Sequence, residues 1–153
     1  MVRRWRRQLE DPSHYGQRVR EALGPVLKTW LECPHIWMTY RSTQIVTGHG
    51  VFGEFLHRIQ KANSPECEHC GAEIDTATHT LEECEAWESE RAALLDAFGD
   101  NISLPSIFRQ AVEDINKWRT FLAFCEKVQS AKEDAERLRQ DQPAARRRRR
   151  VRS

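Results

Sequence analysis

The 153-residue sequence lacks any long apolar run, and none of its runs approaches the roughly 20 residues that a transmembrane helix needs. No apolar stretch follows the basic N-terminal residues, so we expect no secretory signal. A strong net charge is also lacking, because 24 Lys and Arg offset 23 Asp and Glu to +1, which excludes a uniformly basic protein such as a histone. Five cysteines, an odd number without a secretory signal, argue against a disulfide scaffold and for a reducing, intracellular compartment.

The charges are unevenly distributed along the chain. Residues 1–61 hold ten basic and five acidic side chains, whereas residues 66–100 hold one basic and eleven acidic ones. Residues 101–142 are balanced with seven of each sign, and residues 143–153 carry six Arg and no acid. Such asymmetry predicts nucleic-acid contact at the basic ends, and a solvated surface with a purely solubilising tail is the alternative. The candidate contact residues are Arg3, Arg4, Arg6, Arg7, Arg146, Arg147, Arg148, Arg149, Arg150 and Arg152.

Apolar residues recur at three- and four-residue spacings, which predicts a mostly α fold without convincing strands. Thr80-x-x-Glu83 has the spacing of a capping box and predicts a helix that begins at Thr80. The apolar face of the last helix ends at Val128, so we expect residues 132–139 to form a solvated helical extension with ion pairs. The expected helices cover residues 15–31 with a break at Gly24-Pro25, 38–47 with a cap at Gly48, 52–59, 81–98, 105–112 with Pro105 in its first turn, and 114 to Pro143.

These features divide the chain into five segments. They are a basic N-terminal segment with a helix (1–34), a helical segment with a Thr-Gly-His-Gly motif (35–65), a Cys/His segment with a helix (66–100), C-terminal helices (101–142) and a disordered Arg-rich tail (143–153). We therefore predict a small helical domain organised around the Cys/His segment.

The strongest chemical signal is Cys67-x2-Cys70-x8-His79-x4-Cys84. Thiolate and imidazole are the ligands that tetrahedral structural Zn²⁺ sites prefer, and the short gap between Cys67 and Cys70 lets one tight turn present both sulfurs. Gly71 eases that turn, because glycine adopts positive φ at little cost. The motif predicts a zinc knuckle with one structural Zn²⁺ per chain and no open coordination position.

The spacing of the last two ligands needs a local explanation. His79 and Cys84 are five positions apart, which does not place them on one face of an ideal α-helix. If Thr80 is the N-cap, His79 lies just outside the helix and Cys84 lies in its first turns, so that both side chains reach one ion.

The remaining cysteines and histidines show no second ligand set. We expect Cys33 and Cys125 to be buried free thiols, although Cys33-Pro34-His35 has the residue types of half a metal site. His69 is a competing ligand in principle, and an exposed spacer is the interpretation we favour. His49, between two glycines, is interpreted as a structural turn residue.

Two stretches carry a resemblance to a known family. They are Tyr40-Arg41-x2-Gln44-x2-Thr47-Gly48-His49-Gly50-x-Phe52-Gly53-x2-Leu56 and Cys67-x2-Cys70-Gly71 followed by Asp75-Thr76-x2-His79-x-Leu81-x2-Cys84-x2-Trp87-x3-Arg91. Together they resemble the C-terminal cysteine–histidine region, downstream of the reverse transcriptase, of insect non-LTR (LINE-type) retrotransposon polyproteins. The similarity covers roughly residues 35–140 and is strongest to type-1 elements that insert into ribosomal RNA genes.

The resemblance implies a nucleic-acid-binding region with zinc ligands at Cys67, Cys70, His79 and Cys84. Its parent polyprotein is expected to have RNA-directed DNA polymerase (reverse transcriptase) and endonuclease activities. This stretch itself carries no catalytic motif: it has no Asp-Asp dipeptide for the paired metal ions of a polymerase and no endonuclease constellation. The acids of residues 66–100 are expected on a solvated face. We therefore interpret the chain as a fragment or truncated copy, with no catalytic residues of its own.

Two functions remain open at this stage. The first is a zinc-stabilised module that binds an RNA template or target DNA during retrotransposition, has the rest of the polyprotein as a partner and acts in the nucleus. The second is a structural or protein-interaction module without direct nucleic-acid contact. The eleven acids of residues 66–100 favour the second, because they repel a phosphate backbone. We nevertheless favour the first, with the Cys/His segment as a scaffold and the basic ends as the nucleic-acid contacts.

Overall fold

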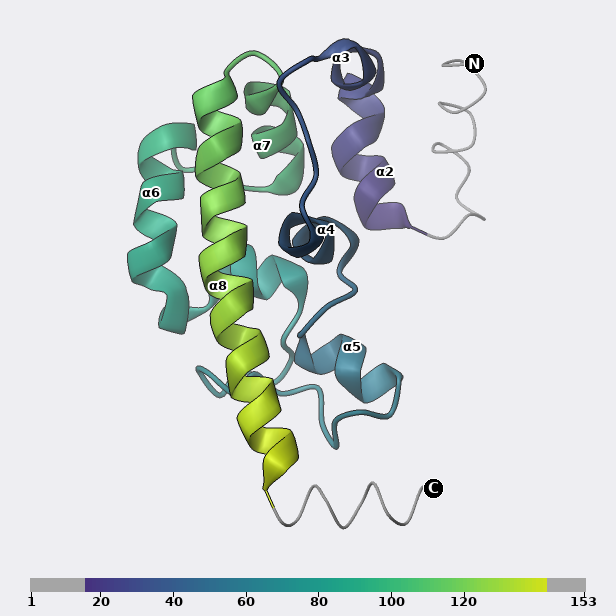
Figure 1. The fold of residues 1–153 in the computed structure, drawn as a ribbon, viewed down its shortest axis with the longest axis vertical. Coiled ribbons are helices and arrows are strands. Elements are labelled where there is room, and N and C mark those ends of the chain that lie inside the picture. Colours follow the sequence, from purple (N-terminus) through teal and green to yellow (C-terminus); the bar gives the residue numbers. More distant parts are fainter. Residues whose placement is uncertain (1–15, 143–153) are drawn as a thin grey trace.

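The computed structural model describes residues 16–142, which form a mostly helical body with no strand among them (Figure 1). The fold class predicted from apolar periodicity is confirmed to that extent. The helices are α2 (Gln17–Leu23), α3 (Leu27–Glu32), α4 (Tyr40–Thr47), α5 (Gly53–Arg58), α6 (Glu88–Phe98), α7 (Leu104–Ala111) and α8 (Ile115–Asp141). Shorter turns are two 3-10 turns, Gly24–Val26 and Glu85–Trp87, and one π-helical turn, His79–Glu83.

Helix α8 is the central element, and α4, α6 and α7 pack along it (Figure 1). Its aromatic side chains Trp118 and Phe121 are fully buried. The ring of Trp30 stacks on Phe108 at 4.5 Å between centroids and meets Trp118 edge-on at 5.2 Å. The Trp118 indole donates its N–H to the carbonyl oxygen of Trp37 at 2.8 Å. The aromatic cluster anchors the N-terminal helices to α7 and α8.

Several predicted helix ends are confirmed. Gly24-Pro25 falls in a 3-10 turn between α2 and α3, and Gly48 caps α4 with a φ of 75°, a backbone conformation that glycine adopts most readily. Pro105 lies in the first turn of α7. Asp114 caps α8, because its carboxylate accepts the N–H of Asn116 at 2.8 Å.

The helix predicted to begin at Thr80 is wrong. The chain forms a π-helical turn over His79–Glu83, breaks at Cys84, whose ψ is 120°, and reaches α6 only after a 3-10 turn. Thr80 is buried inside the π-helical turn, and its hydroxyl is engaged by Asp75 and Lys132 rather than by a backbone N–H. The side chain that looked like a cap is therefore part of a buried polar cluster.

The solvated extension predicted for residues 132–139 is wrong at its start. Lys132 is 1% exposed, and Gln129, one turn earlier, is fully buried. The apolar pattern of α8 ends at Val128, but the Cys/His segment and α5 cover the next turn, so polar side chains with partners continue the core. Within residues 16–142, none of the helices combines the length and the apolar character that crossing a bilayer requires.

Candidate metal centre

Four side chains from the Cys/His segment converge on one point. The ligand atoms of Cys67, Cys70, His79 and Cys84 all lie within 4.8 Å of one another. Sγ of Cys67 is 3.8 Å from Sγ of Cys84, and Sγ of Cys70 is 3.2 Å from Nε2 of His79. Metal–ligand bonds of about 2.3 Å to sulfur and about 2.0 Å to nitrogen give tetrahedron edges of about 3.8 Å and 3.5 Å. The cluster therefore has the dimensions to hold a metal ion.

The first two ligands lie on a tight turn, as the sequence predicted. The N–H of Gly71 donates to the carbonyl of Cys67 at 2.9 Å, and the N–H of Cys67 donates to the carbonyl of Ala72 at 2.9 Å. Gly71 has a φ of 79°, which a residue with a side chain adopts only with strain. The turn places Cys67 and Cys70 side by side at the cluster.

The last two ligands are brought together by the π-helical turn. The N–H of Cys84 donates to the carbonyl of His79 at 2.7 Å, a bond that spans five residues instead of the usual four. This widened turn places residues five apart on the same side, which an ordinary α-helix does not do. The cap that we predicted at Thr80 is thus replaced by a π-helical turn, with the same result that His79 and Cys84 meet. Thr76 accepts the N–H of His79 at 3.0 Å and steadies its start.

Burial controls the protonation of the thiols. Desolvation raises the pKa of Cys84 to about 12 and also raises the pKa of Cys67 above its ordinary value. Desolvation acts on Cys70 in the same direction, but hydrogen bonds to its sulfur, led by the backbone N–H of Ala72, outweigh it and lower the pKa of Cys70. A divalent ion bound here has to displace the thiol protons, so its binding releases protons to solvent.

Glu83 lies beside the imidazole nitrogen of His79 that faces away from Cys70. Its carboxylate lies 3.6 Å from Nδ1 of His79, while Nε2 of the same ring faces Cys70. Histidine ligands are commonly oriented by an acceptor at the nitrogen that does not bind the metal. The arrangement is suited to Nε2 as the ligand atom, and no motif in the sequence pointed to Glu83.

Arg91 fixes the backbone of the π-helical turn. Its buried guanidinium, which comes from α6, donates three hydrogen bonds to backbone carbonyls of that turn. The acceptors are Leu81 at 2.9 Å, Thr80 at 3.1 Å and Cys84 at 2.8 Å. It is the only basic residue within residues 66–100 and the last residue of the stretch that carries the family resemblance, but nothing in the sequence pointed to this structural role.

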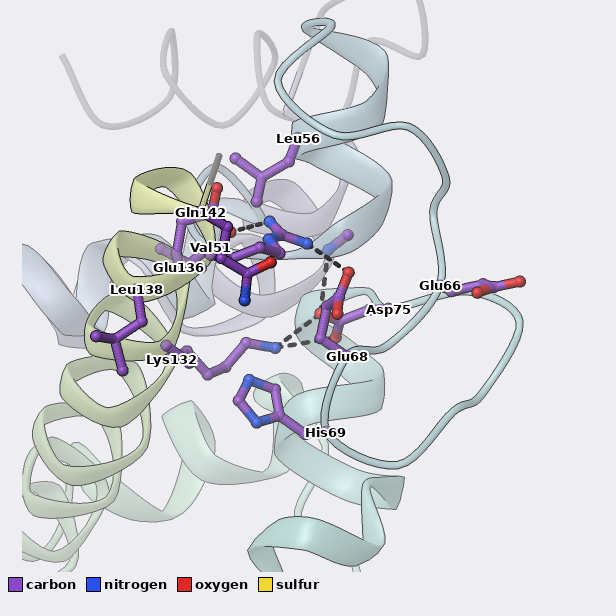
Figure 2. A pocket seen from close by; sticks show the side chains of 13 residues that line it. Val51, Leu56, Glu66, Glu68, His69, Asp75, Lys132, Glu136, Leu138 and Gln142 are labelled. Carbon is purple, nitrogen blue, oxygen red and sulfur yellow. Dashed lines mark hydrogen bonds and ion pairs between the residues drawn. The ribbon is translucent and has the colours of Figure 1, made fainter. Parts of the chain in front are cut away.

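A buried ion pair joins the Cys/His segment to α8 (Figure 2). Nζ of Lys132 lies 2.8 Å and 3.0 Å from the two carboxylate oxygens of Asp75 and 3.0 Å from the hydroxyl of Thr80. Asp75 also accepts the N–H of Gly53 at 3.0 Å, which links α5 to the same cluster. The expectation that the acids of residues 66–100 are solvated is therefore wrong for Asp75, which is 4% exposed. The charge of Lys132 offsets that of the carboxylate, so both groups are tolerated inside.

The Thr-Gly-His-Gly motif and the residues after it allow neighbouring segments to pack closely. A Cβ on Gly50 would lie 2.8 Å from Cβ of Gln44, and a Cβ on Gly53 would lie 2.5 Å from the carbonyl oxygen of Glu66. Both glycines are thus required by close approach, the second one to the Cys/His segment itself. Phe52 is buried between them, with Nζ of Lys132 5.1 Å from its ring centroid.

The other predicted residues have mixed outcomes. Cys125 is a buried free thiol as expected, whereas Cys33 is half-buried, with its sulfur 3.3 Å from Nε2 of His35. His69 is not an exposed spacer: it is half-buried against Trp87, with ring centroids 5.0 Å apart. Burial there lowers the pKa of His69. The ten arginines predicted to contact nucleic acid, and the tail from residue 143, lie outside the described residues.

Comparison with known proteins identifies relatives in insect mobile elements. The chain is 30% identical over 95 residues to the retrovirus-related Pol polyprotein from type-1 retrotransposable element R1 4 of Nasonia vitripennis, covering 62% of this chain and 24% of that protein. It is 26% identical over 129 residues to the putative 115 kDa protein in type-1 retrotransposable element R1DM of Drosophila melanogaster, covering 84% of this chain and 12% of that protein. No protein-family model and no solved structure matches the chain.

These relatives confirm the resemblance read from the motifs: the homologues of this chain are proteins of insect R1 retrotransposons. The chain spans a quarter or less of their length. It therefore corresponds to one region of such a protein.

Proposed function

We propose that this chain is a zinc-stabilised module of a retrotransposon polyprotein that binds nucleic acid through its basic ends. The homologues in R1 elements support the retrotransposon origin. In this proposal the RNA-directed DNA polymerase and endonuclease activities reside in other regions of the polyprotein, and the module acts with them in the nucleus. Its ligand is an RNA template or a DNA target.

The observation that carries the proposal is the closed Cys/His cluster. Cys67 is 2% exposed and Cys84 is fully buried, and three cysteines with one histidine supply the four ligands that a tetrahedral structural site takes. A catalytic zinc keeps a position for water or substrate, and a structural zinc does not. We assign the ion as one structural Zn²⁺ that ties the segment at residues 67–84 into the helical body.

The distribution of charge assigns the nucleic-acid contacts. Residues 16–142 hold 14 basic and 21 acidic side chains, so the helical body has a balance of −7. The segments outside it hold ten Arg and two acids. Phosphate contacts from Lys and Arg dominate the affinity of nucleic-acid-binding proteins, so the terminal segments supply the general attraction and the zinc module serves as their scaffold.

A protein-interaction module is the second candidate, and the surface of the body favours it. The net negative charge would repel phosphates, and several large apolar side chains are exposed. Tyr40 and Leu138 are each 72% exposed, and Ile74 is 53% exposed. In this alternative the exposed apolar groups contact another region of the polyprotein.

Salt-dependent binding separates the two candidates. The zinc-loaded full chain is titrated onto labelled RNA and duplex DNA, beside a chain without residues 146–153 and a control in which the six tail arginines are lysines. If the tail contacts duplex phosphates, deletion reduces the slope of log affinity against log salt by about 2–4, at roughly 0.9 per contact. The lysine control keeps most of the slope. A full chain that binds neither nucleic acid rejects this function and leaves the interaction module.

A further inference from the structure

A cavity lies where α2, the end of α4 and α5 meet the residues just before the π-helical turn. It has a volume of about 240 Å³. Its lining includes two arginines, Arg18 and Arg58, and a single acid, Glu54. This local excess of positive charge contrasts with the acidic balance of residues 16–142.

Arg18 carries a hydrogen-bonding group that the described residues leave unused. Its Nε donates to the carbonyl of Ile45 at 3.0 Å, and its Nη1 donates to the hydroxyl of Thr78. The third nitrogen, Nη2, is buried and has no hydrogen-bond partner within the described part of the chain. A guanidinium stays charged, and a buried donor without an acceptor is costly, so an anionic acceptor in the cavity is favoured once a small shift of the Arg18 side chain exposes Nη2 to it.

Two carboxylates lie near Arg18 and favour its charged form, but neither accepts a hydrogen bond from Nη2. Burial lowers the pKa of Arg18, and the nearby carboxylates of Glu82 and Glu21 partly offset that effect. Neither carboxylate lines the cavity. Ile45 and Thr78 therefore hold the guanidinium, and Nη2 is its one nitrogen without a partner among the described residues.

An aromatic and cationic rim borders the same cavity. The imidazole of His49 stacks on the ring of Phe55 at 4.8 Å between centroids, with 15° between the planes. Cζ of Arg58 lies 5.4 Å from the centroid of that ring. His49 and Arg58 are exposed, so both are accessible to a ligand. Rings that offer stacking beside arginine are the usual components of single-strand nucleic-acid sites.

From these contacts we infer that the cavity binds a phosphate of a single-stranded nucleic acid, with Arg18 and Arg58 as donors and His49 beside an adjacent base. The inference rests on the proposed function and deepens it, because it gives the otherwise acidic body a contact of its own. Gly16 and Gln17 line the cavity, so the basic N-terminal segment joins the body at this point.

The test compares three substitutions in the zinc-loaded full chain. Arg58→Gln and His49→Ala alter exposed side chains and leave the buried contacts of Arg18 intact. Arg137→Gln is the matched control, because its side chain on α8 is 70% exposed, does not line the cavity and forms an exposed ion pair with Asp134 at 3.7 Å. Affinity for a labelled oligothymidylate is measured by fluorescence anisotropy over a range of salt concentrations, with melting temperatures recorded for all four proteins.

We expect His49→Ala to weaken binding about five-fold or more, as loss of one stacked base does. Arg58→Gln is expected to weaken binding and to reduce the salt slope by about 0.7, the value for one phosphate of a single strand. Arg137→Gln is expected to change neither quantity. The side-chain Nε–H resonance of Arg18 is expected to shift on addition of the oligonucleotide.

The possible outcomes distinguish a failure of the cavity assignment from a failure of the proposed function. Equal, small losses for Arg58→Gln and Arg137→Gln, with an unmoved Arg18 resonance, overturn the cavity assignment while leaving binding by the chain ends in place. A parent chain that does not bind the oligonucleotide, RNA or duplex DNA overturns the proposed function, and the cavity assignment with it.

Discussion

Lys132 on α8 and Asp75 in the Cys/His segment form a buried ion pair, with Nζ 2.8 Å from a carboxylate oxygen. The side chains are 1% and 5% exposed. The pair links the Cys/His segment to α8, the longest helix among the described residues (Figure 2). It connects the Cys/His cluster to the helical core.

Lys132→Met should destabilise the protein by about 3–5 kcal/mol, because Asp75 is left as a buried charge without its partner. Lys127→Met is the matched control on the same helix: its ammonium is 72% exposed and lies 4.0 Å from Glu90, so its loss should change stability by less than about 0.5 kcal/mol. Urea unfolding in zinc-containing buffer measures both. Similar unfolding midpoints for the two variants would show that the buried pair contributes nothing.

The helices, several helix ends and the four candidate ligands could be predicted from the sequence. Periodic apolar positions, Gly48, Pro105 and Asp114 indicated helices and their ends, because those signals act over three or four residues. The four candidate ligands were found for the same reason, since residue type and spacing carry the chemistry. Prediction failed where a residue's role depends on a distant partner. Lys132 and Asp75 are 57 positions apart, and a lysine in a charged stretch gives no sign that it is buried.

The π-helical turn was missed for a related reason. Its widened geometry is stabilised by Arg91, which lies on the next helix and donates to the carbonyls of Thr80, Leu81 and Cys84. Thr80 followed by Glu83 looked like a local cap, and tertiary contacts gave its hydroxyl another use. The five-residue spacing of His79 and Cys84 was the available signal, and it was attributed to a helix start instead.

Gly53→Ala should be more destabilising than Gly24→Ala. A Cβ at Gly53 would lie 2.5 Å from the carbonyl oxygen of Glu66, so the metal-binding segment has to move, at a cost of about 1–3 kcal/mol. A Cβ at Gly24 meets nothing within 4 Å beyond its chain neighbours, so the cost there is limited to the crowding that Pro25 imposes on the residue before it. Thermal unfolding of both variants provides the comparison. If Gly53→Ala and Gly24→Ala have the same melting temperature, the close approach of Gly53 to the carbonyl of Glu66 does not restrict the residue at position 53.

Glu83→Gln should weaken metal binding by about ten-fold, at the lower end of what outer ligands contribute, because its carboxylate is 67% exposed. The effect arises from the loss of the negative charge that lies 3.6 Å from Nδ1 of His79. Glu88→Gln, also an exposed acid, is the control for general charge. Competition with a chelator of known zinc affinity gives the two constants, and equal constants would remove Glu83 from the site.

Removing the metal should loosen the Cys/His segment first. Its turn is held by the N–H groups of Cys67, Gly71 and Cys84, and these bonds depend on the four ligands staying together. Hydrogen exchange after chelation should therefore rise in residues 65–87 and less in α7 and the first half of α8, which share the aromatic core. Uniform loss of protection along the chain would mean that no part of the helical core persists without the metal.

The central claim is that Cys67, Cys70, His79 and Cys84 together hold one structural Zn²⁺. Native mass spectrometry of the chain purified in zinc-containing buffer tests it most directly, beside Cys84→Ser and a Cys33→Ser control outside the cluster. The account predicts one zinc per chain in the parent and in Cys33→Ser, and none retained in Cys84→Ser. A folded parent chain without bound zinc, or a Cys84→Ser variant that binds it as tightly as the parent, would contradict the claim.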